Sequence, residues 1–211
     1  MGMPALALAL LAVYGFLAFG VRMVAHVRRT GSTGFKGLRG ASGSEWTGGS
    51  LLVTAVVLCV VGPALQLEGV LHPLAALDGA LANILGIVLA SVGIAMTVVA
   101  QFAMGDAWRV GVDPSERTEL VTNGPFSLAR NPIFAAMIPS FTGIVLLATN
   151  VPTIAGVILL TVALELHVRL VEEPHLLRVH GEQYAAYAAR VGRFVPGIGR
   201  LRLDGTGPAD A

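Results

Sequence analysis

The sequence predicts an all-α integral membrane protein with about five transmembrane helices and no Rossmann domain. Hydrophobic residues make up 55% of the 211 residues and charged residues only 13%, and the mean hydropathy of +0.74 exceeds that of water-soluble globular domains. Apolar stretches of about 18 to 25 residues, long enough to cross ~30 Å of hydrocarbon, recur along the chain. Strands do not alternate with helices, which argues against a soluble nucleotide-binding domain.

The first three predicted spans lie in the N-terminal half. The first runs from about Pro4 to Val24; no basic residue precedes it and no small-residue cleavage site follows, so we expect a retained span rather than a signal peptide. The second runs from Leu51 to Leu71, with a kink expected at Pro63, and the third from Leu81 to Met104.

The last two spans are separated by a very short turn. The fourth covers Pro132 to Ala148 and the fifth runs from Val151 to about Val171. Only Thr149 and Asn150 lie between them, which predicts a tight antiparallel helical hairpin.

The basic residues predict the orientation. All 14 lie near the loops on one side of the predicted bundle, and the N-terminus, residues 72–78 and the 149–150 turn have none. By the positive-inside rule the N-terminus is outside and the C-terminus cytoplasmic. The net charge of +1 therefore conceals an asymmetric distribution. No patch interleaves basic and aromatic residues as a nucleic-acid groove does, so we expect a lipid bilayer and no nucleic acid as partner.

Three segments divide the chain. Residues 1–79 hold two spans joined by a glycine-rich loop (31–43), which is either a flexible connector or a lid over a cytoplasmic site. Residues 80–197 hold three spans, a polar loop (105–131) broken by turn dipeptides, and a cytoplasmic helix whose apolar stripe is Leu176, Val179, Tyr184, Tyr187 and Val191. Residues 198–211 are expected to be a disordered tail.

Ionisable side chains at the membrane boundary suggest a site. Glu165, Arg169 and Glu172 or Glu173 share one face at helical spacing. Charged groups within hydrocarbon are costly and usually face a protein interior or a wet cavity, although an ion-paired stripe that snorkels to the interface is the simpler alternative. Arg130 could likewise be a snorkelling anchor, with Asn131 capping the fourth span.

Other chemistries find little support. Glu172 and His175 form a single Glu-x-x-His, whereas a di-iron bundle needs two, and Pro174 interrupts the pair, so we expect no metal. His26, His72 and His167 have no partner at ligand spacing and are expected to be interfacial or packed. The lone Cys59 offers no disulfide, and no Gly-x-Ser-x-Gly nucleophile elbow occurs.

Two motifs in the right order carry a family resemblance. The first is Leu120-Val121-Thr122-x-Gly124-Pro125-Phe126 followed by Arg130-Asn131-Pro132-x-Phe134. The second is Glu172-Glu173-x-x-Leu176, His180-Gly181, Tyr184 and Tyr187, then Val191-x-Arg193-Phe194-x-Pro196. Together they resemble the isoprenylcysteine carboxyl methyltransferase and phospholipid methyltransferase group of membrane enzymes, over roughly residues 80 to 197.

The resemblance implies a membrane helix bundle that encloses S-adenosylmethionine and transfers its methyl group to a lipophilic acceptor, such as a prenylcysteine-like carboxylate, a lipid amine or an isoprenoid. We expect the chain to lie in the bacterial inner membrane, with the cofactor site facing the cytoplasm. Implied cofactor contacts are Thr118, Glu119, Leu120, Val121, Phe126, Arg130, Asn131, Pro132, Ile133, Phe134, Glu173 and Tyr184.

The implied chemistry gives these residues roles. Glu173 would hold the ammonium of the cofactor, and Arg169 would grip an acceptor carboxylate. An amine, phenol or thiol acceptor would need a base, for which Glu165, Glu172 and His180 are the candidates. Departures from the family pattern at Thr118, Asn131, Phe126, Phe134 and His180 leave the acceptor open. The alternatives are an NADPH-dependent membrane reductase of the sterol or enone type and a non-catalytic membrane scaffold.

Overall fold

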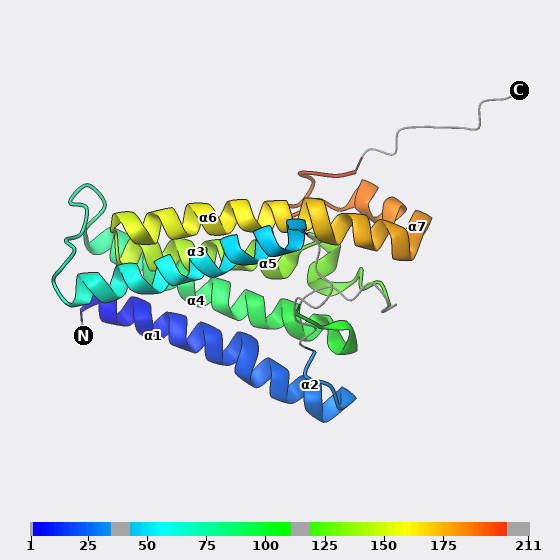
Figure 1. Ribbon diagram of the computed structural model, residues 1–211, viewed down its shortest axis with the longest axis horizontal. Coiled ribbons are helices and arrows are strands. Elements are labelled where there is room, and N and C mark those ends of the chain that lie inside the picture. The colour runs from blue at the N-terminus through cyan, green and yellow to red at the C-terminus, as the bar shows by residue number, and fades with distance from the viewer. Residues whose placement is uncertain (1, 35–42, 111–118, 202–211) are drawn as a thin grey trace, which may run out of the picture.

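A bundle of long apolar helices forms the body of the protein (Figure 1). The computed structural model describes residues 2–34, 43–110 and 119–201. In these residues the only β-type pairing is an isolated bridge between Ala129 and Gly192. Together with four helices long and apolar enough to cross a membrane, this confirms the predicted all-α membrane fold.

The N-terminal half forms three long helical segments. Helix α1 (Met3–Gly15) continues through a π-helical turn (Phe16–Val21) into α2 (Arg22–Thr30), so the first helix extends beyond the predicted end at Val24. Helix α3 (Gly43–Leu67) begins eight residues before the predicted Leu51 and contains Pro63 in its interior. Helix α4 (Ala80–Ala103) matches the third predicted span closely.

The C-terminal half holds the predicted hairpin. Helix α5 (Pro132–Leu147) begins at the predicted proline, and α6 (Val151–His167) follows after Asn150, whose side-chain oxygen accepts a hydrogen bond from Thr153 N. At 16 residues, α5 is about 24 Å long, less than the ~30 Å hydrocarbon core. The number of spans therefore stays a prediction, as does the orientation.

The predicted cytoplasmic helix is continuous with the last span. A π-helical turn (Val168–Glu172) joins α6 to α7 (Glu173–Arg190), which bends at Gly181, a residue with a φ of 50°. Tyr184 and Tyr187 form the centre of a small core with Ala188, and Leu176 and Val191 pack against it. The apolar stripe of this helix is thus largely as predicted.

Small residues let the helices approach closely. Helix α4 packs against α5, and α3 packs against α6. A Cβ added at Gly143 of α5 would lie 2.5 Å from the backbone nitrogen of Ala90 in α4. In membrane bundles the association of helices depends on such close packing, because lipid tails are as apolar as the helix surfaces.

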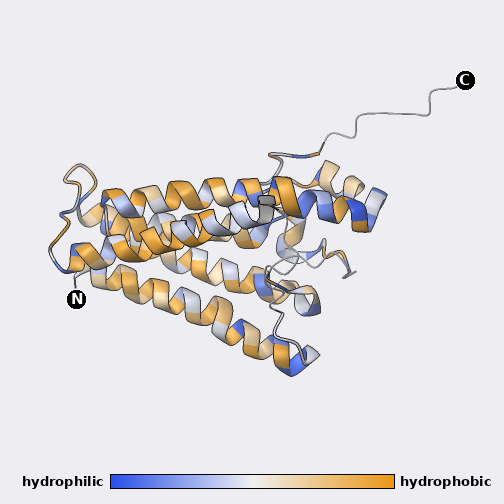
Figure 2. Cartoon of the chain, in the orientation of Figure 1, coloured by the Kyte–Doolittle hydropathy of each residue, from blue (hydrophilic) through white to orange (hydrophobic). Residues whose placement is uncertain are grey.

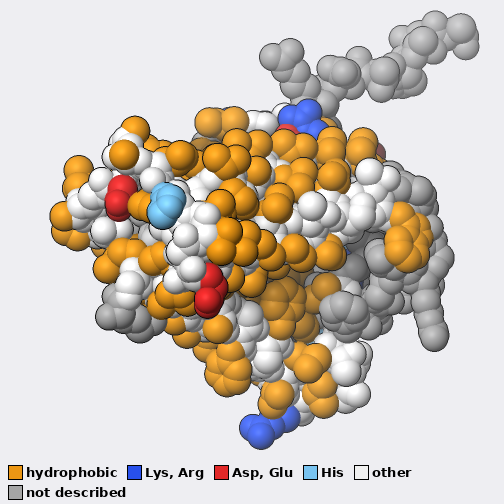
Figure 3. All heavy atoms as spheres, turned by 60° about the vertical axis from the view of Figure 1, so that its left-hand side comes forward, with side chains coloured by type: hydrophobic (Ala, Val, Ile, Leu, Met, Phe, Trp, Pro, Cys, Tyr) orange, Lys and Arg blue, Asp and Glu red, His pale blue; other side chains and the backbone are white. Residues whose placement is uncertain are grey.

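Polar residues gather at one end of the bundle (Figure 2). The N-terminus and the segment between α3 and α4 lie at one end, and α2 and α7 lie at the other (Figure 1). The face in Figure 3 is covered mainly by hydrophobic side chains with few charges. The glycine-rich loop, the Asp113-Pro114 turn and the tail lie partly or wholly outside the described residues, and the three-segment division stays a prediction.

Candidate functional site

A cavity of about 390 Å³ lies where the bundle meets the polar end. The membrane helices supply its apolar wall, which includes Tyr14, Phe19, Leu52, Met137 and Leu164. Its polar wall comes from described residues on both sides of the 111–118 gap, from the end of α6 and from the turn and helix that follow; it includes Arg109, Glu119, His167, Glu172, His175 and His180. One cavity therefore has an apolar side within the bundle and a polar side beyond it.

Most residues predicted for the site line this cavity. They are Glu119, Leu120, Val121, Phe126, Arg130, Asn131, Pro132, Ile133, Phe134, Glu172 and Tyr184. The lining does not include Glu165, Arg169 or Glu173, which lie together in a charged network that meets the cavity at Arg130. Thr118 lies outside the described residues.

The predicted turn before the fourth span shapes one wall. A 3-10 turn (Gly124–Ser127) begins at Gly124, whose φ of 56° suits glycine. It buries the ring of Phe126. The hydroxyl of Tyr187 donates a 2.6 Å hydrogen bond to the Phe126 carbonyl, which ties the turn to α7.

Arg130 joins this turn to the chain after α7. Its backbone nitrogen donates to Gly192 O at 2.8 Å, and its guanidinium donates to Ala188 O at 2.8 Å and to Gly199 O at 3.0 Å. The next residue, Asn131, donates to Arg193 O from its backbone at 3.0 Å. The arginine in the turn is therefore a buried clamp between two segments distant in sequence.

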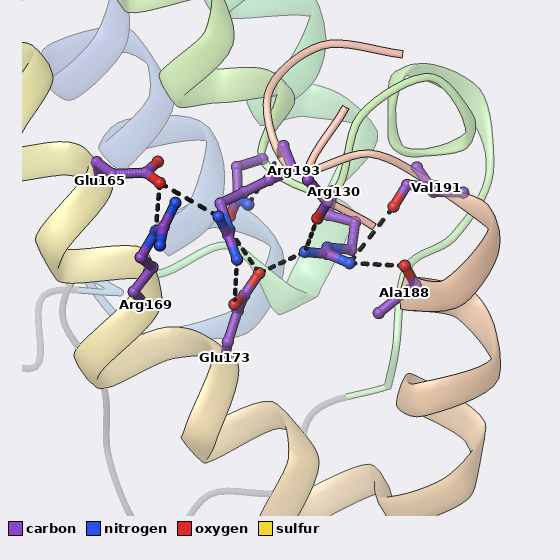
Figure 4. Close-up of polar contacts among 9 residues, drawn as sticks. Arg130, Glu165, Arg169, Glu173, Ala188, Val191 and Arg193 are labelled. Carbon is purple, nitrogen blue, oxygen red and sulfur yellow. Dashed lines mark hydrogen bonds and ion pairs between the residues drawn. The ribbon is translucent and has the colours of Figure 1, made fainter. Parts of the chain in front are cut away.

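Glu173 is the counter-charge of this clamp (Figure 4). Its Oε1 accepts hydrogen bonds from Arg130 Nη2 at 2.5 Å and from Arg193 Nε at 2.9 Å, and its Oε2 accepts one from Arg193 Nη2 at 2.9 Å. The side chains of Arg130 and Glu173 are 1% and 9% exposed. Both oxygens of the carboxylate predicted to hold the cofactor ammonium are thus engaged by arginines.

The network continues outward to the predicted catalytic stripe. Arg193 Nη1 donates to Glu165 Oε1 at 3.2 Å, and the exposed Arg169 pairs with the same carboxylate. Hydrogen bonding to Glu173 raises the pKa of Arg193, so its cationic form is stabilised. Glu165, Arg169 and Glu173 form one charged stripe, as their spacing predicts, and Glu172 is separated from it.

The π-helical turn explains this separation. Glu173 N donates to the carbonyl of Val168, five residues earlier, so the turn holds one residue more than an α-helical turn. Because of the extra residue, every side chain after the turn is rotated back around the helix axis by about 100°, the angle of one residue. Glu173 then occupies the position that regular helical spacing gives to Glu172, and Glu172 falls within roughly 40° of His167.

His167 is a site residue that sequence reasoning missed. It lines the cavity, and its Nε2 lies 3.4 Å from Glu172 Oε1. Its ring meets the Phe134 ring edge-on, with the centroids 6.2 Å apart. The i,i+5 spacing of the pair is no neighbour relation in an α-helix, so only knowledge of the π turn could have revealed it.

A second missed feature flanks the cavity at α2. The buried Arg22 donates to Gln101 O at 3.2 Å and to Gly105 O at 2.6 Å, and its guanidinium carbon lies 4.7 Å from the centroid of Trp108. Gln101 and Trp108 both line the cavity. This arginine supports the wall through cation–π and carbonyl contacts.

Two buried polar atoms of the lining have no hydrogen-bond partner. They are the acceptor Gln101 Oε1 and the donor Arg130 Nε. A buried polar atom without a partner costs about 1–3 kcal/mol, so such atoms at a cavity indicate a place for a polar ligand. Among the described residues, no three His, Cys, Asp or Glu side chains are grouped to hold a metal ion.

The sequence matches a family of membrane methyltransferases and a curated relative. Residues 81–183 match the family model described as phospholipid methyltransferase. The nickel-cobalt-cadmium resistance protein NccN of Alcaligenes xylosoxydans xylosoxydans is 31% identical over 116 residues, which are 54% of this chain and 53% of that protein. The chain thus spans about half the length of this curated relative.

A solved membrane enzyme has a similar fold. The eukaryotic intramembrane Ras methyltransferase, isoprenylcysteine carboxyl methyltransferase, gives a TM-score of 0.59 at 17% identity over 92% of this chain and 66% of its own. At this identity the likeness concerns the fold alone. The family match over residues 81–183 and the similar fold together confirm the resemblance predicted from the two motifs.

Proposed function

We propose that this protein is a membrane-embedded methyltransferase that uses S-adenosylmethionine and methylates a lipophilic acceptor. The observation that carries the proposal is a cavity that combines a polar wall from the loop and α7 with an apolar wall from the membrane helices. Its volume of about 390 Å³ falls in the ~300–1,000 Å³ range of small-molecule sites. The match of residues 81–183 to the phospholipid methyltransferase family supports the same activity.

The polar wall fits the cofactor. Glu119 offers a carboxylate that could pair with the ammonium group of S-adenosylmethionine. Arg130 Nε is a buried hydrogen-bond donor without a partner, and it could donate to an oxygen of the cofactor. The rings of Phe126 and Tyr184 offer apolar and aromatic surface for the adenine or the sulfonium. Since both oxygens of Glu173 already accept from arginines, we assign Glu173 to shaping this wall rather than to the ammonium.

The apolar wall fits the acceptor. Tyr14, Leu52, Met137 and Leu164 come from helices α1, α3, α5 and α6, so the acceptor's apolar part would lie within the bundle. When bound, S-adenosylmethionine supplies an electrophilic methyl group. The chain's own task is then to align the acceptor with this methyl and to exclude water. We propose that the site lies at the polar end of the bundle and that this end faces the cytoplasm of a bacterium.

A reductase is less consistent with the cavity. The 2′-phosphate of NADPH requires basic groups, and the Arg and Lys side chains among the described lining residues are Arg109 and Arg130. Arg130 is already paired with Glu173. A scaffold, in turn, does not require a cavity that combines a polar wall with an apolar one.

Calorimetric titration of the detergent-purified protein tests the proposal. S-adenosylmethionine and S-adenosylhomocysteine should bind saturably, and NADPH should not. Binding of NADPH alone would assign the cavity to a reductase. If none of the three ligands binds to protein that circular dichroism shows to be folded, the scaffold is favoured.

A further inference from the structure

Gln101 is a buried polar residue of the cavity that the proposed cofactor contacts do not use. It lies near the end of α4, is 5% exposed and lines the cavity. Its Oε1 atom accepts no hydrogen bond from the described residues. A buried acceptor without a donor destabilises the protein that carries it, so such an atom beside a cavity indicates that a ligand supplies the donor.

A buried arginine fixes the backbone from which this side chain extends. Arg22 Nε donates to the carbonyl of Gln101 at 3.2 Å, and Arg22 Nη2 donates to the carbonyl of Gly105 at 2.6 Å. The guanidinium carbon also lies 5.2 Å from the centroid of the Phe102 ring. Since the last carbonyls of a helix have no partner within the helix, this cation holds the end of α4 in place.

Thr97 places a second oxygen without a partner on the same face of α4. It precedes Gln101 by four residues, a spacing that puts two side chains on one helix face. It is 0% exposed, and its Oγ1 has no hydrogen-bond partner among the described residues. Polar side chains within membrane helices are costly and usually face a protein interior or a cavity with a function. This face of α4 therefore has the polarity of a binding surface.

The surroundings of Gln101 determine which donor fits. Helix α4 packs against α1 and the first π-helical turn, which contribute Tyr14 and Phe19 to the apolar wall. Arg22, 2% exposed, is already a cation at this helix end. Because like charges repel strongly where water is excluded, an ammonium group is disfavoured there. A carboxylate has no proton to offer to Oε1, so a neutral donor fits best.

We infer that Gln101 is a specificity-determining residue that accepts a hydrogen bond from a neutral donor, a hydroxyl or an amide N–H, on the lipophilic acceptor. This inference rests on the proposed function and names a polar feature that the acceptor carries besides its apolar part. The packing of α4 against the two segments that carry Tyr14 and Phe19 assigns Gln101 to the acceptor rather than to the cofactor.

Matched probes test the donor. 1-Dodecanol, dodecanamide and dodecyl methyl ether share one tail, and the ether alone has no proton on its polar group. Each probe is titrated calorimetrically into the protein–S-adenosylhomocysteine complex in detergent, with its partition into the micelles measured and corrected for. We expect dodecanol or dodecanamide to bind at least about 5-fold more tightly than the ether, as one hydrogen bond predicts. The tighter of the two identifies a hydroxyl or an amide as the donor.

The variant Gln101→Met removes the amide and keeps a side chain of similar length. The preference for the donor probe over the ether should disappear in Gln101→Met. It should persist in Gln183→Met, which makes the same change at an exposed residue of α7 outside the lining. Three results would overturn the inference: an undiminished preference in Gln101→Met, no preference in the unmodified protein, or tighter binding of dodecylammonium or dodecanoate than of both donor probes.

Thermal unfolding of the ligand-free protein separates ligand binding from a structural role. Because Oε1 has no partner in the free protein, Gln101→Met should leave Tm within about 2 °C of the unmodified value or raise it. A larger fall in Tm would show that the amide supports the fold, and the inference would then be wrong.

Binding of S-adenosylhomocysteine separates the two levels of the proposal. If the unmodified protein does not bind it, the proposed function itself fails. We expect Gln101→Met to bind it within about twofold of the unmodified protein, so that a lost probe preference concerns the acceptor alone. A clear loss of this affinity in Gln101→Met would assign the amide to the cofactor, for example to the amino group of its adenine, and would overturn the role in acceptor recognition.

Discussion

Removing the carboxylate of Glu173 should destabilise the fold, because it would leave a buried cation without its counter-charge. Arg130, whose side chain is 1% exposed, pairs with Glu173 at 2.5 Å. Loss of one partner of a buried ion pair typically costs about 3–5 kcal/mol. The carbonyls of Ala188 and Gly199 still accept from the guanidinium, so we expect the lower end, about 3 kcal/mol, for Glu173→Ala.

Thermal unfolding in detergent measures this cost. A domain of about 150–250 residues loses about 2–4 °C of Tm per kcal/mol, so Glu173→Ala should lower Tm by about 6–12 °C. Glu165→Ala is the matched control, because it removes a carboxylate of the same network that pairs with the exposed Arg169 and with Arg193. Exposed pairs contribute about 0–1 kcal/mol, which gives at most about 4 °C.

Loss of cofactor affinity without loss of stability would support the cofactor-binding role that the sequence predicts for Glu173. If Glu173 contacts the cofactor ammonium, Glu173→Gln should lose affinity for S-adenosylhomocysteine while Tm stays within about 2 °C. That combination would refute the clamp, because a glutamine cannot balance the charge of Arg130. A large fall in Tm for Glu173→Ala, with affinity in Glu173→Gln kept within a few fold, would support it.

Three further changes test the helix bundle and the wall of the site. Asn150→Ala removes the cap whose oxygen accepts from Thr153 N and should cost about 1 kcal/mol in thermal unfolding. Gly143→Val forces a side chain into the α4 backbone and should lower Tm by more than about 3 °C, since overpacking costs about 1–3 kcal/mol or more. Tyr187→Phe leaves the Phe126 carbonyl without its 2.6 Å donor; we expect about 1–3 kcal/mol lower stability and weaker calorimetric binding of S-adenosylhomocysteine.

The bundle was predictable because hydropathy and turn signals are local. The start of α5 at Pro132 and the Asn150 turn follow from single residues whose backbone preferences end or begin helices. The second helix was predicted too short, since its first turns (Gly43–Ser50) are polar and glycine-rich and resemble a loop. Helical order there comes from the fold and not from local propensity.

The cavity was predictable only in part. The motif residues of the 119–134 segment line it, because a continuous loop and helix start bring them to one wall. The contributions of Tyr14, Gly48 and Gln101 come from distant helices, and no local pattern reveals which face of an apolar helix meets a cavity. The clamp of Glu173 was likewise hidden, because Arg193 comes 20 residues later and reaches it across the bend of α7 at Gly181.

A single extra residue in one helical turn separates the two adjacent glutamates into different environments. Without the π turn, Glu172 would share the face of Glu165 and Arg169, and His167 would have no carboxylate beside it. With the turn, Glu173 completes the clamp that fixes the loop at Arg130, and Glu172 meets His167 at the cavity. Because both positions depend on the same turn, the clamp that fixes the proposed cofactor wall and the Glu172–His167 pair at the cavity are held in register by the backbone itself.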